Sequence, residues 1–343
     1  MTISLDLLRS LHNTSPTDTW AMLFDHAWNT CTRPSPGVRD HHYVVGSDMD
    51  LAAADLVLAT TAWDLWNHYE TVVPRTSIAL ESWWIDPRPG AHTGRAVLIL
   101  DGLSLREVPF LLDAARQRGF SVLQARVTGA EIPADTTSFA QSLGYSGRMT
   151  LRNNGGVGIG RLAGASTDTT DISFDACAAQ IGSDQNYVLW HHWPDCRLHA
   201  LCGPGLGLSA LAKEAASVLV GDPFWNMVEV LTAGRRLVIT SDHGYAASGL
   251  FTDTDDSSQQ RYLRDRFKSG RWSRVSPDTP ASNQNWVPPL DIRIRTVHSD
   301  GRFVLGRRKW KSPGGYPTLT HGGLSLLEVA VPFVELAQDA RAR

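Results

Sequence analysis

The sequence predicts an α/β protein in which helices cover both faces of a mainly parallel central sheet. Two observations support this fold class. From about residue 95 to residue 335, short apolar runs typical of buried strands alternate with amphipathic stretches typical of helices. Acidic and imidazole side chains follow several of these runs, and folds of this class bind ligands at the carboxyl ends of their strands.

Residues 1–90 are expected to form a mostly helical N-terminal region. The clearest helix here spans residues 48–69, with Asp48 or Asp50 as its N-cap. The Pro-Arg-Pro-Gly segment at 87–90 marks a boundary before the first strong strand. The sequence does not assign a role to this N-terminal region.

Residues 91–343 are expected to form the α/β domain. Gly119 is a typical C-terminal stop for the first helix of this domain. The predicted strands span residues 95–100, 120–127, 186–192, 236–241 and 328–335, and the predicted helices span residues 105–118 and 208–219.

The composition excludes several classes of protein. A hydrophobic content of 42% and a charged content of 20% are typical of a soluble globular protein with a full core. No apolar run approaches the length of about 20 residues that a membrane span needs, and the N-terminus lacks a signal-peptide pattern. We therefore expect no membrane partner. Four cysteines do not make a disulfide framework in a chain of this length, so we expect a cytoplasmic location.

Positive charge is concentrated in residues 261–311. This segment holds 13 Lys and Arg but four Asp and Glu, in a chain whose formal net charge is -3. Such a segment predicts a patch that attracts an anionic substrate, or else a solvated loop that compensates acidic neighbours such as residues 252–256. The charge pattern supports both interpretations equally. The expected substrate contacts are Arg307, Arg308, Lys309 and Lys311.

Candidate metal ligands follow the predicted strands or lie in loops near them. Asp195 and His199 are four residues apart and share one face if their turn is helical. Carboxylates and imidazoles without thiolates suit zinc or manganese in a catalytic site rather than a structural zinc. Their number suits two adjacent divalent ions, which in hydrolytic sites lie about 3.5–4 Å apart. The set is Asp101, Asp195, His199, Asp242, His243 and His321.

A hydroxyl nucleophile is predicted in the loop at 133–138, after the strand at 120–127. A hydroxyl there could ligate one metal, lose its proton and attack phosphorus. Thr136 is the first candidate, but Thr137 and Ser138 adjoin it and remain alternatives.

These residues, taken in order, resemble the alkaline phosphatase superfamily. Within it, the chain is similar to PglZ-domain proteins, which occur in BREX phage-defence systems and as an output domain of some response regulators. The resemblance covers roughly residues 95–335. Each motif alone is weak, but five in the expected order are specific. The motifs are Asp101-Gly102-Leu103, Pro133-x-x-Thr136, Asp195-x-x-x-His199, Ser241-Asp242-His243-Gly244, and Thr320-His321-Gly322-Gly323-Leu324-Ser325 with residues 328–332.

The resemblance implies an alkaline phosphatase-like α/β/α sandwich with two divalent ions, zinc foremost and manganese as the alternative. One ion would be held by Asp101, Thr136, Asp242 and His243, and the second by Asp195, His199 and His321. His192 is an alternative to His199. Thr136 would attack phosphorus in line, and water would then hydrolyse the phosphothreonine intermediate.

The function implied is a metal-dependent phosphodiesterase. We expect an anionic, nucleotide-like substrate, such as an oligonucleotide, a cyclic nucleotide or a nucleic-acid end, and a role in phage defence or signalling with defence-system proteins as partners. Two alternatives remain at this point. One is a phosphomonoesterase, and the other is a non-catalytic, metal-stabilised interaction module of a defence complex.

Overall fold

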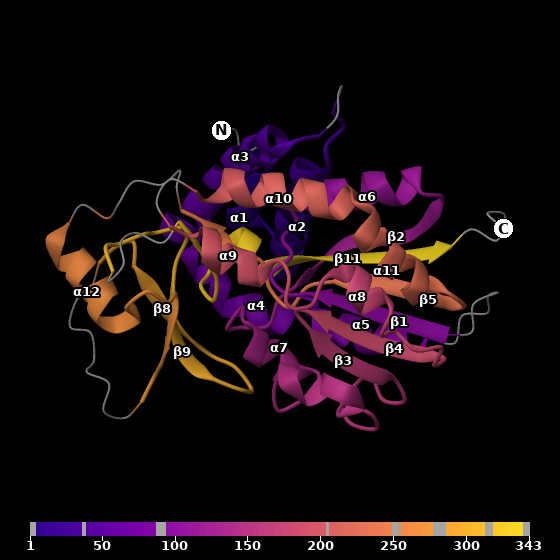
Figure 1. Cartoon of the computed structure of the whole chain (residues 1–343). Coiled ribbons are helices and arrows are strands. Elements are labelled where there is room, and N and C mark those ends of the chain that lie inside the picture. The colour runs from indigo at the N-terminus through magenta and orange to yellow at the C-terminus, as the bar shows by residue number, and fades with distance from the viewer. Residues whose placement is uncertain are drawn as a thin grey trace.

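The structure is a computed structural model, and it describes residues 5–35, 39–86, 94–203, 206–248, 254, 256–276, 286–312 and 318–338. A six-stranded sheet in the order β2-β11-β5-β1-β4-β3 forms its centre (Figure 1). The strands are β1 (Gly94–Leu100), β2 (Phe120–Gly129), β3 (Ser166–Thr170), β4 (Asn186–His191), β5 (Arg235–Thr240) and β11 (Ala330–Gln338). β1 is parallel to β4 and β5, and β3 is parallel to β4, whereas β11 is antiparallel to both of its neighbours.

Two hydrophobic clusters cover the two faces of the sheet. Along β1, Leu98 packs into the larger cluster with helices α6 (Val108–Gln117), α10 (Leu208–Val220) and α11 (Asp222–Thr232). The next residue, Ile99, packs into the other cluster with side chains of α5 (Thr76–Ile85) and α7 (Thr136–Ser142). This alternation is what a strand buried on both faces requires. The predicted fold class, a mainly parallel sheet between two helical layers, is therefore confirmed.

The N-terminal region is mostly helical, as predicted. Its helices are α1 (Leu5–Asn13), α2 (Pro16–Thr32), α3 (His41–Thr60), α4 (Trp66–Val72) and α5 (Thr76–Ile85). Trp20 of α2 and Leu58 of α3 belong to the same buried cluster as Leu98 of the sheet, so these helices share the core of the α/β part. The predicted boundary between residues 90 and 91 lies outside the described residues.

The helix predicted over residues 48–69 is different in the structure. α3 begins at His41, because the Asp40 side chain caps it by accepting hydrogen bonds from the backbone N–H groups of His42 and Tyr43. A 3₁₀ turn, η1 (Trp63–Leu65), then separates α3 from α4. The prediction of Asp48 or Asp50 as the cap is therefore wrong.

A smaller lobe projects beside the sheet, at the left of Figure 1. We call it the cap lobe, and it consists of α12 (Ser257–Phe267) and a three-stranded antiparallel sheet of β7 (Trp272–Arg274), β9 (Asp300–Val304) and β8 (Asp291–Arg295). The remaining elements are η2 (Arg148–Asn154), α7 (Thr136–Ser142), α8 (Phe174–Ala178), α9 (Asp195–Leu201), β6 (Ala246–Ala247), β10 (Leu319–Thr320) and α13 (Leu326–Val329). Across the described ranges, no helix combines the length and the apolar character needed to cross a bilayer.

The topology brings five loops to one edge of the sheet. The loops after β1, β2, β4 and β5 leave from this edge because those strands run in the same direction. β11 runs the opposite way, so the segment before it arrives at the same edge. All the predicted metal ligands and the predicted nucleophile lie in these five segments.

Candidate metal centre

The first cluster joins the loops after β1 and β5. Asp101, Asp242 and His243 are completely buried, and their ligand atoms lie within 4.8 Å of one another. His243 Nε2 lies 3.5 Å from Asp101 Oδ1 and 3.5 Å from Asp242 Oδ2. The other oxygen of Asp242 is held by the backbone N–H groups of Gly102 and His243, each at 3.0 Å.

The second cluster joins helix α9 to the segment before β11. Asp195 and His199 lie on one face of α9, and their side chains are 3.2 Å apart. His321 Nε2 lies 3.6 Å from Asp195 Oδ1. The ligand atoms of these three residues also lie within 4.8 Å of one another. His199 is the most open member, with 62% of its side chain exposed.

The two clusters are directly adjacent. The backbone N–H of Asp195 donates to the carbonyl of Asp101 at 2.8 Å. The rings of His243 and His321 stack with their centroids 4.1 Å apart. Between the clusters, Gly102 has a φ of +77°, and a Cβ on it would lie 3.2 Å from the Cβ of Asp195. Only glycine fits this approach without strain.

The imidazoles of His243 and His321 both have the hydrogen bonding of metal ligands. His243 donates its Nδ1–H to the carbonyl of Gly244 at 2.9 Å, and His321 directs Nδ1 to the carbonyl of Ala134 at 3.3 Å. Because a carbonyl only accepts, Nδ1 carries the proton of each neutral ring, and Nε2 of the neutral ring then has a lone pair that faces carboxylate oxygens. Among the described residues, His243 Nε2, Asp242 Oδ2 and Asp195 Oδ1 have no hydrogen-bond partner. Facing lone pairs of this kind need a cation, so the residues fit bound divalent ions.

The ionisable groups of the second cluster shift one another's pKa values. Burial raises the pKa of the Asp195 carboxyl, but the His199 hydrogen bond and the nearby His243 and His321 outweigh burial and lower this pKa to about 2. The hydrogen bond to Asp195 raises the pKa of His199. Burial and the neighbouring His243 lower the pKa of His321 to about 3. A carboxylate and a neutral imidazole are the forms that bind metal.

The predicted nucleophile loop reaches the first cluster. Thr136 begins α7 and its hydroxyl donates to Asp101 Oδ1 at 3.3 Å. Thr137 is exposed, and Ser138 is buried with its backbone N–H bound to the Asp135 cap. Of the three hydroxyls considered from the sequence, that of Thr136 is the one hydrogen-bonded to a candidate metal ligand.

His192 does not join the second cluster. Its Nε2 lies 3.2 Å from the hydroxyl of Thr169 on β3, whereas His199 lies beside Asp195. The structure therefore groups Asp195 with His199, the arrangement that the sequence favoured over His192.

Arg148 was not predicted from the sequence. It begins η2, and its guanidinium forms an ion pair with Asp101 Oδ2 while 23% of its side chain stays exposed. No periodic or motif signal marks this position, because its partner lies 47 residues away.

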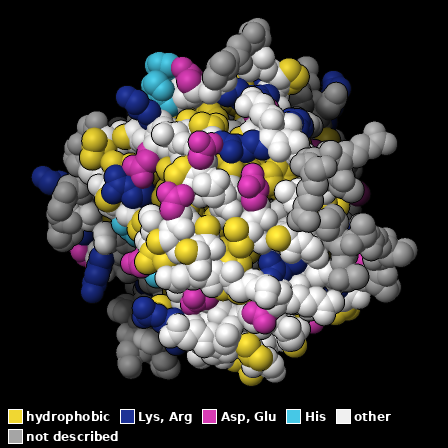
Figure 2. Space-filling view, turned by 45° about the vertical axis from the view of Figure 1, so that its right-hand side comes forward, with side chains coloured by type: hydrophobic (Ala, Val, Ile, Leu, Met, Phe, Trp, Pro, Cys, Tyr) yellow, Lys and Arg dark blue, Asp and Glu magenta, His cyan; other side chains and the backbone are white. Residues whose placement is uncertain are grey.

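The four cations expected to contact substrate differ in how far they are exposed to solvent. Arg307 is fully buried and its guanidinium is bound by Asp48 and Asp55, so the expectation that it contacts substrate is wrong. Burial lowers the pKa of Arg308, and Lys309 is half-buried. Lys311 is exposed. Exposed arginines lie instead on the cap lobe, and Figure 2 shows Lys and Arg side chains projecting on the side where this lobe lies in Figure 1.

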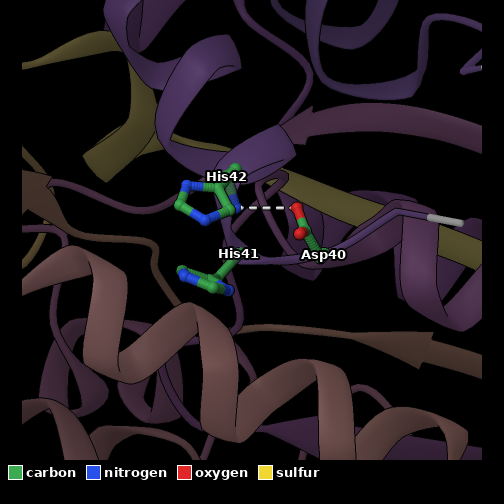
Figure 3. Close-up of side chains that lie close together, drawn as sticks. All are labelled: Asp40, His41 and His42. Atoms are coloured by element: carbon green, nitrogen blue, oxygen red, sulfur yellow. Dashed lines mark hydrogen bonds between the residues drawn. The ribbon is translucent and has the colours of Figure 1, made fainter.

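A third group, Asp40, His41 and His42, also brings possible ligand atoms within 4.8 Å (Figure 3). It lies at the start of α3, and the Asp40 carboxylate is already bound to the backbone N–H groups of the first turn. The positive end of the helix dipole disfavours a cation at this place. We assign Asp40 to helix capping and no metal to this group.

No protein-family model and no curated protein matches the chain. The solved structures to which it is similar include the following three. Two are of murine ectonucleotide pyrophosphatase/phosphodiesterase 5. An inactive variant in complex with AMP has 14% identity over 71% of this chain and 87% of that chain, with a TM-score of 0.45. The second has 15% identity over the same shares, with a TM-score of 0.44. The third is phosphonoacetate hydrolase from Sinorhizobium meliloti 1021 in complex with phosphonoformate, with 12% identity over 72% of this chain and 90% of that chain, and a TM-score of 0.42.

Proposed function

We propose that the chain is a metal-dependent phosphoester hydrolase of the alkaline phosphatase superfamily, of the PglZ type. The observation that carries the proposal is the pair of adjacent carboxylate–imidazole clusters with a threonine hydroxyl on one of them. Unpartnered polar atoms face one another in both clusters, and the stacked rings of His243 and His321 lie in contact between them. Paired sites of this type serve phosphoester hydrolysis.

Two divalent ions would be held by this chain, zinc foremost and manganese as the alternative. Asp101, Asp242 and His243, with the Thr136 hydroxyl, would hold one ion, and Asp195, His199 and His321 would hold the other. When bound, the ions would stabilise negative charge on the attacking and leaving oxygens.

Thr136 would attack phosphorus. Its oxygen forms the new bond to phosphorus while the bond to the leaving alkoxide oxygen breaks. The hydroxyl proton moves toward Asp101 Oδ1, to which it already donates. Water then attacks the phosphothreonine and releases the phosphoryl product. Arg148, at the same carboxylate and partly exposed, is placed to contact the non-bridging oxygens.

The substrate would be a nucleotide-like phosphodiester. The cap lobe supports this substrate class because it adjoins the second cluster. Gly322 directly follows His321, and a Cβ on Gly322 would lie 2.9 Å from Trp272 of β7 in the cap lobe. This lobe presents Arg264, Arg293 and Arg295 to solvent, with 51%, 48% and 74% of their side chains exposed. Arg264 pairs with Asp265, and Arg293 and Arg295 share one partner, Asp300, so the arginines outnumber the acids that they contact. Exposed cations beside a phosphoester site attract polyanions. A role in phage defence or signalling, with defence-system proteins as partners, accords with the PglZ resemblance.

The proposal is tested by hydrolysis of bis-p-nitrophenyl phosphate. Protein stripped of metal and reloaded with zinc or manganese should hydrolyse this diester, and the Asp242→Ala variant should not. p-Nitrophenyl phosphate, a monoester, should be the poorer substrate. If metal-loaded, folded protein hydrolysed neither compound, the proposed function would be wrong and an interaction module would be favoured.

A further inference from the structure

Helix α3 carries two aspartates that lie at the centre of a buried network of charges. Asp48 Oδ1 accepts hydrogen bonds from Arg106 Nε at 2.9 Å, Arg106 Nη2 at 2.6 Å and Arg307 Nη1 at 2.7 Å. Asp55 Oδ2 accepts from Arg307 Nε at 2.6 Å. All four side chains are 0% exposed. The N-terminal region therefore contributes the acidic half of this network.

Arg106 connects Asp48 to the first cluster. It lies five residues after Asp101, and its Nη1 donates to the carbonyl of Tyr245 at 2.8 Å. Its guanidinium also lies over the Tyr245 ring, 4.5 Å from the ring centroid. Tyr245 lies two residues after His243. One buried cation thus joins the two loops that hold Asp101, Asp242 and His243.

Asp55 connects to the second cluster by a separate route. Its Oδ1 accepts a hydrogen bond from the backbone N–H of Leu326 at 2.5 Å. Leu326 begins α13, five residues after His321. Gly323 and Ser325 lie between His321 and Leu326. Their backbone N–H groups donate to the Glu328 carboxylate at 2.8 and 3.0 Å. The His321 loop is therefore fixed at its far end by Asp55.

Stability alone does not explain such a network. Buried ion pairs often contribute no more to stability than well-packed apolar residues of similar volume. Here the arginines and the Asp55–Leu326 bond lead to the loops that carry metal ligands, and such outer contacts orient the ligands.

We propose that Asp48 and Asp55 are positioning residues that set the two metal clusters separately. Asp48 acts through Arg106 on Asp101 and His243, and Asp55 acts through Leu326 on His321. This gives the N-terminal helices a part in the site. The inference rests on the proposed function, because it requires both clusters to bind metal.

The experiment is a calorimetric titration of metal-stripped protein with zinc, repeated with manganese. Wild type should bind two ions, and the His243→Ala and His321→Ala variants identify which binding step belongs to which cluster. Asp48→Asn should weaken binding at the first cluster about tenfold or more, and Asp55→Asn should do the same at the second. Each variant should leave the other step nearly unchanged.

Glu335→Gln is the matched control. Glu335 is also fully buried in an ion pair, with Arg236, but this pair joins β11 to β5 within the sheet. The control should lower the melting temperature and change neither metal affinity. If the aspartate variants do not fold, Arg106→Lys keeps the charge but removes the forked contact with Asp48, and it should weaken binding at the first cluster alone. Arg307→Lys should weaken binding at both clusters, because Arg307 contacts both aspartates.

Three results would overturn the inference. The first is two-ion binding in which the aspartate variants shift neither affinity more than Glu335→Gln does. The second is an equal loss at both clusters in every variant, which indicates general destabilisation. In the third, wild type binds no ion, and the proposed function then fails together with the inference.

Discussion

The imidazole ring of His321 stacks on that of His243 with their planes 16° apart. His321 lies in the segment before β11, and His243 lies in the loop after β5. β5 and β11 are neighbouring antiparallel strands. Each ring directs Nδ1 to a backbone carbonyl and Nε2 to a carboxylate. The stack therefore brings two candidate metal clusters into contact at one edge of the sheet.

Metal binding should stabilise the folded chain. Asp101 and Asp242 are both fully buried, and a divalent ion between them removes the cost of burying like charges. A ligand at 100 times its Kd adds about 2.7 kcal/mol of stability. Adding zinc to stripped protein should therefore raise the melting temperature in scanning calorimetry. Asp242→Asn should lose a large part of this increase, and an equal increase in that variant would contradict the assignment of Asp242 as a ligand.

Gly102→Ala should damage the site. At a φ of +77° the new side chain is strained, at a cost of about 1–2 kcal/mol, and its Cβ presses on Asp195. Gly119→Ala is a matched control, because Gly119 has a φ of +76° but nothing within 4 Å of a Cβ. Denaturant unfolding should show a similar loss of stability in both variants. Metal affinity and hydrolysis should fall only in Gly102→Ala, and normal affinity in that variant would argue against the contact.

Glu107 should give the chain a pH-dependent loss of stability. Burial raises the pKa of Glu107 from 4.5 to about 7, although the Tyr245 hydroxyl donates to it. Because the folded chain holds this proton more tightly than the unfolded chain, the contribution of Glu107 to stability falls as pH rises from about 4.5 to about 7. Glu107→Gln abolishes this titration.

The measurement for Glu107 is urea unfolding of both proteins across this pH range. Between about pH 4 and about pH 8, wild type should lose on the order of 3 kcal/mol of unfolding free energy that Glu107→Gln keeps. Parallel stability curves for the two proteins would show that Glu107 does not titrate in this way.

Arg295→Glu should weaken the binding of a polyanionic substrate. Arg295 has 74% of its side chain exposed on the cap lobe and lies outside both clusters. KM for an oligonucleotide should rise about three- to tenfold at low salt with kcat little changed, and the difference should shrink as salt is added. Arg116→Glu, at an arginine 62% exposed on α6, is the control. Equal KM values for the two variants would exclude the cap lobe from substrate binding.

Much of the fold could be predicted from the sequence because its strands are apolar runs. The β1 segment at 94–100 and the β5 segment at 235–240 were found within a residue or two. β3 was missed, because Ser-Thr-Asp-Thr-Thr at 166–170 contains no apolar run. The strand at β11 was predicted but its direction was not, since antiparallel pairing with β2 and β5 depends on tertiary contacts.

The site could be predicted only in part, for a related reason. Most of the predicted ligands follow strands, and the structure brings them together in the two groups that the family resemblance implied. Because aspartate commonly begins a helix, the sequence predicts Asp48 or Asp50 as a helix cap. Asp48 instead binds Arg106 and Arg307, which lie 58 and 259 residues away, and no local pattern reveals pairs at such separations.

We propose that Thr136 attacks phosphorus beside the first cluster. The most direct test is the turnover of bis-p-nitrophenyl phosphate by metal-loaded Thr136→Ala beside Thr137→Ala, with the bound metal measured in both. Thr136→Ala should lose about three orders of magnitude or more in kcat while at least the second cluster keeps its ion, and Thr137→Ala should stay within a few-fold of wild type. Wild-type turnover by Thr136→Ala, or loss of turnover in Thr137→Ala alone, would contradict the account.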